Sequence, residues 1–221
     1  LADIISYSVN TGKSLTELLR HRYPYFIELE EALSKIVIAY EAGKKAANAM
    51  DFDDLLSKTH LLMVTHPEIA KLYQHQFRAV LVDEYQDTNL LQASLIDLLA
   101  AHHQHVMVVG DDAQSIYSWR GANVANILEF PKRYPKAQLF PIETNYRSVP
   151  QILKLANASL TFNTNQFPKE LQASRLPHVI SPALVPLSTN NEQASFVAQR
   201  ILELYDEGIP FSEMAVLYRA H

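Results

Sequence analysis

Apolar and polar residues follow one another in blocks that predict helices separated by short strands. Apolar side chains recur at helical spacing over residues 26–50, which predicts a long helix with one apolar face. That face consists of Phe26, Leu29, Leu33, Ile36, Val37 and Tyr40. A second helix is expected after Asp51, whose side chain can cap its first turn. Further helices are predicted over residues 66–77, 89–102, 124–134, 149–160 and 192–208.

Two compact apolar runs bounded by charge, at residues 78–84 and 105–112, are typical of strands buried on both faces of a sheet. Strands that alternate with helices predict an α/β fold with a mostly parallel sheet. Residues 162–186 contain four prolines and are expected to form an irregular linker. Other strands are expected at residues 137–143, 183–188 and 214–219.

Composition narrows the class of protein but does not define its function. The chain has 221 residues, of which 48% are hydrophobic and 19% charged, as in ordinary globular proteins. The net charge of −5 does not by itself favour binding to nucleic acid, which is also negatively charged. Without cysteines there are no disulfides or thiolate metal sites, and no apolar run approaches the roughly 20 residues of a membrane span. We expect a soluble, cytoplasmic protein that makes no membrane contact, and both ends of the chain read as cuts through a longer one.

Paired carboxylates follow the first apolar run, in "AVLVDEYQDTN". Asp83 and Glu84 are expected at the carboxyl end of a strand, where ligands bind in open parallel sheets. There one carboxylate can hold Mg²⁺ and the next can deprotonate a water molecule. The alternative is a solvated acidic turn before a helix that is capped by Asp87 and Thr88.

A second polar turn, "GDDAQSIYSWRGAN", follows the next apolar run. Gln114 is expected where its amide can sense a phosphate bound at the neighbouring strand. Tyr117, Trp119 and Arg120 place two aromatic rings beside a guanidinium, a combination that suits unstacked bases of single-stranded nucleic acid. The alternative is that Trp119, the only tryptophan, anchors a core.

Two shorter signals are weaker on their own. In "ETNYRS", Arg147 can complete a phosphate site as an arginine finger and Tyr146 can stack on an adenine. The alternative is a surface arginine beside a half-buried tyrosine. The histidines of "AHHQH" more simply end a helix than bind a metal.

The segment "TGKS" has the ending of a phosphate-binding loop but not its beginning. In the pattern G-x-x-x-x-G-K-[ST] the first glycine would fall at Tyr7. A capping box that starts a helix, with Ser14 and Glu17, explains the segment better.

Taken together, the motifs resemble those of the UvrD/Rep/PcrA family of superfamily 1 DNA helicases. "DEYQDTN" is similar to the family's motif II, "GDDAQSIYSWRGAN" to motif III and "NYRS" to motif IV, while "MDFDDLL" and "AVLYRAH" also match family segments. The resemblance extends over essentially the whole chain. It implies RecA-like motor domains, with residues 1–50 ending a helical insertion, residues 51–142 completing the first motor domain and residues 143–221 beginning the second.

The resemblance also implies a role for each site residue. Asp83 would bind Mg²⁺ and Glu84 would be the catalytic base. Gln86 and Gln114 would contact the γ-phosphate of ATP or the attacking water. The remaining roles would be single-stranded DNA binding by Tyr117, Trp119 and Arg120, and nucleotide binding by Tyr146 and Arg147.

The function implied is ATP-driven 3′→5′ movement on single-stranded DNA and unwinding of duplex DNA, in repair or replication. The phosphate loop is expected upstream of Leu1, so residues 1–221 alone are expected to show no ATPase activity. Two alternatives are a helicase–nuclease subunit of the RecB/AddA type and a non-catalytic nucleic-acid-binding module. Protein partners are not indicated.

Overall fold

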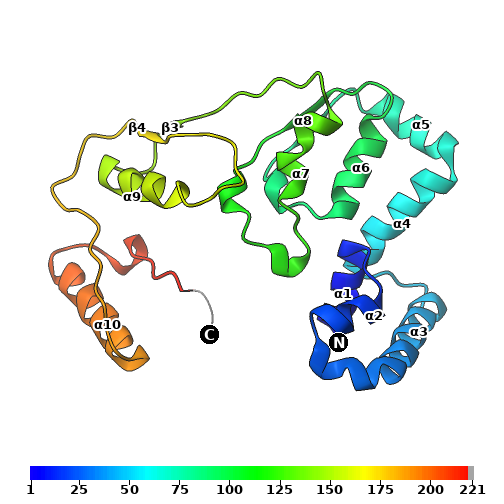
Figure 1. The fold of residues 1–221 in the computed structure, drawn as a ribbon, viewed down its shortest axis with the longest axis horizontal. Helices are drawn as coiled ribbons and strands as arrows, with labels where there is room; N and C mark the ends of the chain where they lie inside the picture. Colours follow the sequence, from blue (N-terminus) through cyan, green and yellow to red (C-terminus); the bar gives the residue numbers. More distant parts are fainter. Residues whose placement is uncertain (219–221) are drawn as a thin grey trace. The chain divides into compact units, whose positions relative to one another are not determined.

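A computed structural model describes residues 1–218 of the chain (Figure 1). The chain divides into two compact units, which are described separately below. Unit 1 comprises Leu1–Thr144 and Ala156–Gln172, and unit 2 comprises Asn145–Leu155 and the chain from Ala173 onward. No helix in the described residues combines the length and the apolar character that a membrane span requires.

Unit 1 begins with helices that the polar punctuation of the sequence explains. Helix α1 (Ala2–Thr11) ends at Gly12, which has a φ of 68° in the left-handed region that favours glycine. Ser14 and Glu17 then form the expected capping box at the start of α2 (Leu15–His21). A helix therefore precedes "TGKS", whereas a phosphate loop requires a strand there.

The long helix predicted over residues 26–50 is shorter than expected. A 3₁₀ helix (Pro24–Leu29) leads into α3 (Glu30–Ala46), and no residue of α3 is buried. The expected cap by Asp51 is present at the start of α4 (Phe52–Thr65), where its carboxylate accepts a hydrogen bond from the Asp54 backbone N–H at 2.8 Å. Helix α5 (Pro67–Gln76) follows with its proline in the first turn.

The parallel sheet of unit 1 contains two strands, β1 (Val80–Val82) and β2 (Val106–Val108). They pair in register, with Val82 opposite Val108. Helix α6 (Leu90–Ala100) connects them, and the short helices α7 (Ala125–Leu128) and α8 (Phe130–Arg133) follow β2. The α/β architecture with a parallel sheet is thus confirmed on a small scale.

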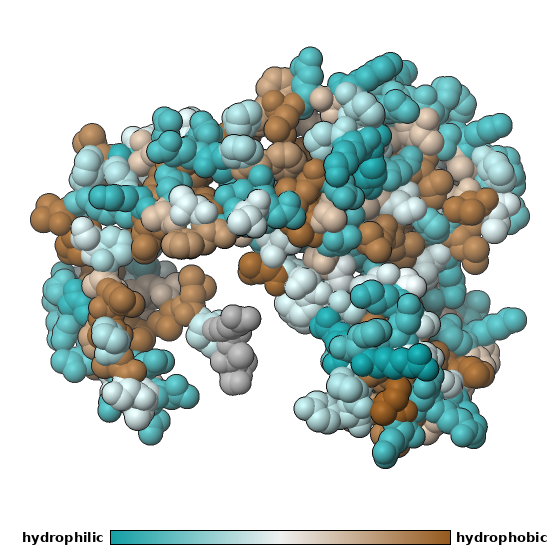
Figure 2. Space-filling view, viewed as in Figure 1, coloured by the Kyte–Doolittle hydropathy of each residue, from teal (hydrophilic) through white to brown (hydrophobic). Residues whose placement is uncertain are grey.

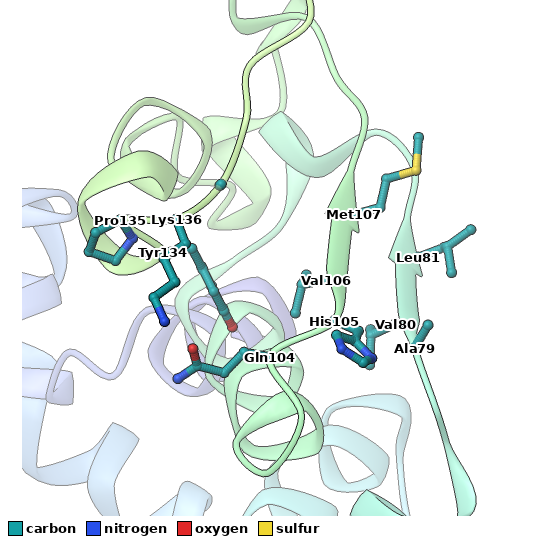
Figure 3. Close-up of a pocket in the computed structure, with 11 residues that line it drawn as sticks. Ala79, Val80, Leu81, Gln104, His105, Val106, Met107, Tyr134, Pro135 and Lys136 are labelled. Carbon is teal, nitrogen blue, oxygen red and sulfur yellow. The ribbon is translucent and has the colours of Figure 1, made fainter.

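One face of this sheet packs on a core and the other does not. Tyr85, Ile127 and Phe130 form the buried cluster, against which Val82 and Val108 pack. On the opposite face, Leu81 is 72% exposed and Met107 58% exposed, and both point away from the helices in Figure 3. The expectation of strands buried on both faces is wrong here, because no element among the described residues covers the second face.

A cavity of about 500 Å³ lies at the amino ends of the two strands (Figure 3). Its lining includes Val80, Val106, Gln104 and Tyr134 but no carboxylate. The acidic residues that follow the strands lie at their other ends, so this cavity is separate from the predicted phosphate site.

Unit 2 contains little regular structure besides α10 (Asn190–Asp206) and the part of α9 (Pro150–Leu160) that belongs to it. Two-residue strands, β3 (Thr144–Asn145) and β4 (Gln172–Ala173), pair with each other, and each has one residue in unit 1 and one in unit 2. Figure 2 shows apolar side chains at the surface around α10, where Phe196 and Leu202 are 41% and 57% exposed.

The strands predicted at residues 137–143, 183–188 and 214–219 are not formed within the described residues. Residue 219 lies outside them. Pro141 and Pro186 remove backbone donors from the first two segments. Glu143, at the end of the first segment, accepts a hydrogen bond from the Gln172 N–H of β4 at 2.8 Å. The rest of the three segments pairs with no strand among the described residues, and an apolar run alone does not make a strand without such a partner.

Candidate nucleotide and nucleic-acid site

Asp83 and Glu84 lie at the carboxyl end of β1, as predicted. The ladder continues past them: the Val109 N–H donates to the Val82 carbonyl at 2.8 Å, and the Tyr85 N–H donates to the Val109 carbonyl at 2.9 Å. The two acidic residues between these bonds are therefore displaced from the sheet, and both are exposed.

The backbone of Glu84 adopts a conformation that is uncommon for a residue with a side chain. Its φ of 51° and ψ of 41° lie in the left-handed region, which costs roughly 1 kcal/mol for a non-glycine residue. Asp83 Oδ1 accepts a hydrogen bond from the Glu84 N–H at 2.9 Å, and this bond helps to hold the turn. The Glu84 carboxylate accepts a hydrogen bond from Gln86, two residues further along the same turn.

Gln86 connects the turn after β1 to the turn after β2. Its Nε2 donates to Glu84 Oε2 at 2.7 Å, and its Oε1 accepts from the Asp111 N–H at 3.0 Å. Only 1% of Gln86 is exposed, and these two bonds satisfy both ends of its amide inside the protein, as a buried polar group requires. The Gln86 carbonyl also accepts from Ser115 Oγ at 3.1 Å. One buried side chain thus fixes the two predicted motifs relative to each other.

Gly110 makes this bridge possible. A Cβ at position 110 would lie 2.3 Å from Gln86 Oε1 and 2.9 Å from Ile127 Cδ1. Neither neighbour is free to move, since Gln86 is hydrogen-bonded and Ile127 belongs to the core. A residue without a side chain is therefore required where β2 enters its turn.

Gln114 is exposed, and its orientation is set by Asp111. Gln114 Nε2 donates to Asp111 Oδ2 at 2.7 Å, while Asp111 Oδ1 forms an ion pair with Lys169. Burial raises the pKa of Asp111, but the hydrogen bonds from Lys169 and Gln114 outweigh it and hold that pKa below its usual value. Sequence reasoning missed Lys169, which lies in the proline-rich segment far along the chain.

Asp87 belongs to the same group but does not cap a helix. The cap of α6 is Asn89, in a capping box with Gln92, so the alternative of a cap formed by Asp87 and Thr88 is wrong. Asp87 Oδ1 is buried without a hydrogen-bond partner among the described residues. Burial and the charge of Glu84 raise the pKa of Asp87, although a hydrogen bond from Gln86 opposes them.

The aromatic residues of the second motif lie at the surface. Trp119 is 55% exposed, so it does not anchor the core. Its ring centroid lies 6.4 Å from that of Tyr117, and the Arg120 guanidinium lies 4.4 Å from the Trp119 ring centroid. The three residues predicted to bind single-stranded nucleic acid therefore form one exposed cluster.

Helices α1 and α2 extend this cluster in a way the sequence did not reveal. Arg22 Nη2 donates to the Trp119 carbonyl at 3.3 Å, and the Arg22 guanidinium lies 4.0 Å from the Tyr7 ring centroid. These residues and Arg120 line a cavity of about 690 Å³. No local pattern around Arg22 signals this, because the contact joins residues 97 positions apart.

Tyr146 and Arg147 belong to unit 2, whereas the carboxylates belong to unit 1. Tyr146 is 73% exposed and Arg147 is also exposed. The Arg147 N–H donates to Asn145 Oδ1 at 3.0 Å, and the Tyr146 carbonyl accepts from Arg175 Nε at 3.1 Å. Their roles at a nucleotide remain a prediction.

The histidines after α6 contact other histidines or the backbone. His102 packs against His75 with ring centroids 4.8 Å apart, and His105 Nδ1 lies 3.1 Å from the Arg78 carbonyl. Within the described residues, no group of histidine and acidic side chains has the arrangement of a metal site.

The fold and site together define an α/β protein with acidic and amide side chains gathered at the carboxyl ends of two parallel strands. Residues 5–135 match the family model described as the UvrD/REP helicase N-terminal domain, and residues 140–221 match the UvrD-like helicase C-terminal domain. The chain belongs to the UvrD/REP helicase family, which confirms the resemblance seen in the motifs.

Individual relatives agree with the family match. The chain is 38% identical to the ATP-dependent DNA helicase PcrA of Leuconostoc citreum over 198 residues, which are 87% of this chain and 26% of that protein. It is 37% identical to PcrA of Staphylococcus aureus strain Mu50 over 191 residues, with shares of 86% and 26%. DNA helicase II of Salmonella typhimurium strain LT2 is 38% identical over 214 residues, with shares of 96% and 29%. The chain thus spans about a quarter of the length of these relatives.

Proposed function

We propose that the protein containing this chain is an ATP-dependent DNA helicase that moves 3′→5′ on single-stranded DNA, in the cytoplasm, and unwinds duplex DNA. The observation that carries the proposal is the bridge from Glu84 through Gln86 to Asp111 and Gln114. The bridge joins the predicted catalytic carboxylate to the predicted phosphate sensor, and the chain that carries both belongs to a helicase family. The named relatives, PcrA and DNA helicase II, support this reading over a helicase–nuclease subunit.

The carboxylates suit Mg²⁺ by their chemistry. Asp83 and Glu84 are exposed, and neither forms an ion pair with a basic residue in the described part of the chain. Their negative charge is therefore available to a cation, and carboxylate oxygens are ligands that Mg²⁺ prefers. In the proposal, Asp83 holds the cation.

Bound Mg²⁺–ATP would supply the reactive γ-phosphate. Glu84 then accepts a proton from the attacking water, and the fixed amide of Gln86 keeps the Glu84 carboxylate in place. Gln114 contacts the phosphate, since its exposed amide is already oriented by Asp111. Arg147 acts as an arginine finger and Tyr146 packs on the adenine.

Single-stranded DNA is proposed to bind at the exposed cluster of Tyr117, Trp119 and Arg120. Bases stack on exposed aromatic rings with little regard to sequence, and the nearby guanidinium groups attract phosphates. Arg22 and Tyr7 enlarge this surface. The turn of residues 111–121 carries Gln114 at one end and Trp119 near the other, so one short segment connects the two sites.

The domain organisation proposed is that of two RecA-like motor domains. Residues 1–50 would end a helical insertion, residues 51–142 would complete the first motor domain, and residues 143–221 would begin the second. The family matches to residues 5–135 and 140–221 support a change of domain near residue 140.

A paired experiment on the full-length protein tests this function. Glu84→Gln keeps an acceptor for Gln86 but removes the base, so ATP turnover should fall about a hundredfold or more while single-stranded DNA binding persists. Trp119→Ala should instead weaken the binding of single-stranded DNA about tenfold, because base stacking on the indole is lost.

Matched controls are available on exposed positions. Glu31→Gln changes a carboxylate that is 84% exposed, and Tyr25→Ala changes a ring that is 95% exposed. Neither should alter turnover or DNA affinity. ATP turnover that is absent from the wild type, or unchanged in Glu84→Gln, would refute the proposed function.

A further inference from the structure

Lys169 forms ion pairs with two aspartates beside the proposed phosphate sensor, Gln114. Its Nζ forms ion pairs with Asp111 and, at 2.8 Å, with Asp112 Oδ1. The Lys169 side chain is 14% exposed and that of Asp112 is 4% exposed. Although burial lowers the pKa of Lys169, the hydrogen bonds to the two aspartates raise it above its usual value. Lys169 is therefore a charged residue held in place, unlike a solvated surface lysine.

The segment that carries Lys169 is anchored on both sides within unit 1. Phe167, two residues earlier, packs against the core cluster of Tyr85, Ile127 and Phe130. Two residues later, Leu171 exchanges hydrogen bonds with the side chain of Asn157, at 2.9 and 3.1 Å. The backbone on both sides of Lys169 is thus anchored by contacts that do not involve the aspartates.

The two aspartates depend on that ammonium. Asp112 Oδ2 is buried with no hydrogen-bond partner among the described residues, and Lys169 is the basic residue paired with Asp112 in the described chain. Without the ammonium, two adjacent carboxylates would face each other with no compensating charge, which favours rotation of the more exposed Asp111 toward solvent. Such a rotation would break the 2.7 Å bond that orients Gln114.

We propose that Lys169 is a positioning residue for ATP hydrolysis: it holds Asp111, and through Asp111 the Gln114 amide, in the orientation that meets the γ-phosphate. This inference rests on the proposed function. Lys169 does not itself contact the nucleotide, so its effect should pass entirely through Gln114. That dependence distinguishes it from a lysine that only stabilises the fold.

A double-mutant cycle in the full-length protein tests the proposal. Lys169→Met should lower the kcat of DNA-stimulated ATP hydrolysis about tenfold, with a smaller change in KM. In a Gln114→Ala background, Lys169→Met should cause no further loss of kcat, because the group that Lys169 positions is gone. Lys132→Met is the matched control: the Lys132 side chain is 80% exposed and forms an ion pair with Glu129, at 3.8 Å, so kcat should not change.

A crystal structure of the full-length Lys169→Met protein gives a readout that does not require activity. The bond between Gln114 Nε2 and Asp111 Oδ2 should be absent there and present in Lys132→Met. If wild-type turnover is independent of Glu84, the proposed function fails, but this structural readout still decides whether Lys169 orients Gln114.

Three results would overturn the inference: an intact Gln114–Asp111 bond in Lys169→Met, an unchanged kcat, or an equal loss of kcat in both backgrounds. Should Lys169→Met not fold, Lys169→Arg replaces it, since a guanidinium keeps the charge but displaces it. Lys169→Arg should lower kcat about threefold in the wild-type background only, and an unchanged kcat would again overturn the inference.

Discussion

At the scale of single residues, the site depends on one buried amide and the glycine beside it. The sequence predicted which residue types follow the two strands, because carboxylates, glutamines and aromatic rings in these turns have a recognisable chemistry. It did not predict that Gln86 would be the side chain that joins the turns. Nor could it predict Lys169 or Arg22, since both reach the site from segments distant in sequence. Contacts between distant segments are set by the folding of the whole unit and have no local signature.

Substitution of Gly110 tests the bridge directly. Gly110→Ala places a Cβ 2.3 Å from Gln86 Oε1, so the core or the bridge must shift. We expect the free energy of unfolding to fall by about 1–3 kcal/mol, as in other overpacked sites. Urea denaturation of the chain, followed by circular dichroism, measures this loss.

Gly43→Ala is the matched control, because a Cβ there meets nothing within 4 Å and the position lies inside α3. Alanine is the better helix former, so this variant should gain about 0.5–1 kcal/mol. Equal stabilities of Gly110→Ala and the wild type would show that the turn relaxes freely.

At the scale of elements, the sequence predicted helices better than strands. A helix carries its own backbone hydrogen bonds, and the predicted caps Ser14 and Asp51 mark helix starts that the structure contains. The helix predicted from residue 89 is also present, although its cap is Asn89 and not Asp87 or Thr88. A strand needs a neighbour, and only the two runs that pair with each other, β1 and β2, became strands of three residues. The runs at residues 137–142 and 183–188 are also apolar but have no strand partner among the described residues.

The ion network between α3 and α4 carries a pH dependence. Lys44 Nζ lies 2.8 Å from both Asp51 Oδ2 and Asp54 Oδ2, and Lys58 lies 2.6 Å from Asp54 Oδ1. The hydrogen bonds from Lys44 and Lys58 hold the pKa of Asp54 far below its ordinary value of 3.8. Burial raises the pKa of Asp51, but Lys44 outweighs burial and lowers that pKa as well.

A carboxyl group with a lowered folded-state pKa stabilises the fold above its unfolded-state value and loses that contribution as the pH falls. The free energy of unfolding should therefore decline as the pH falls below about 5, and the decline should continue below about pH 3, toward the lowered pKa of Asp54. Asp54→Asn should lower the free energy of unfolding at neutral pH by about 2 kcal/mol, a loss limited by the other partners that Lys44 keeps. The decline with pH should be shallower, because the carboxyl group with the lowest pKa is gone. Asp206→Asn, at the exposed end of α10, should retain the wild-type profile. Parallel profiles for Asp54→Asn and the wild type would count against the network.

At the scale of the whole molecule, burial is distributed unevenly between the two units. The buried apolar residues lie in unit 1 with one exception in the described chain, Leu153 of α9. Hydrophobic burial is the main favourable contribution to folding, so the two units should differ in stability. The proposed catalytic residues on β1, β2 and their turns all belong to the unit with the larger core.

Limited proteolysis of the 221-residue chain should detect this difference. The first cuts should fall within residues 174–189, which form no helix or strand and offer exposed backbone, while the segment from β1 to α8 stays intact. Mass spectrometry of the early products identifies the sites. Leu153→Ala should speed cleavage of unit 2, because it removes the buried leucine at a cost of about 2–5 kcal/mol. Cleavage inside the turns of Gln86 or Asp111 at the earliest times would contradict this order, since it would mean that the bridged turns open as readily as the segment that precedes α10.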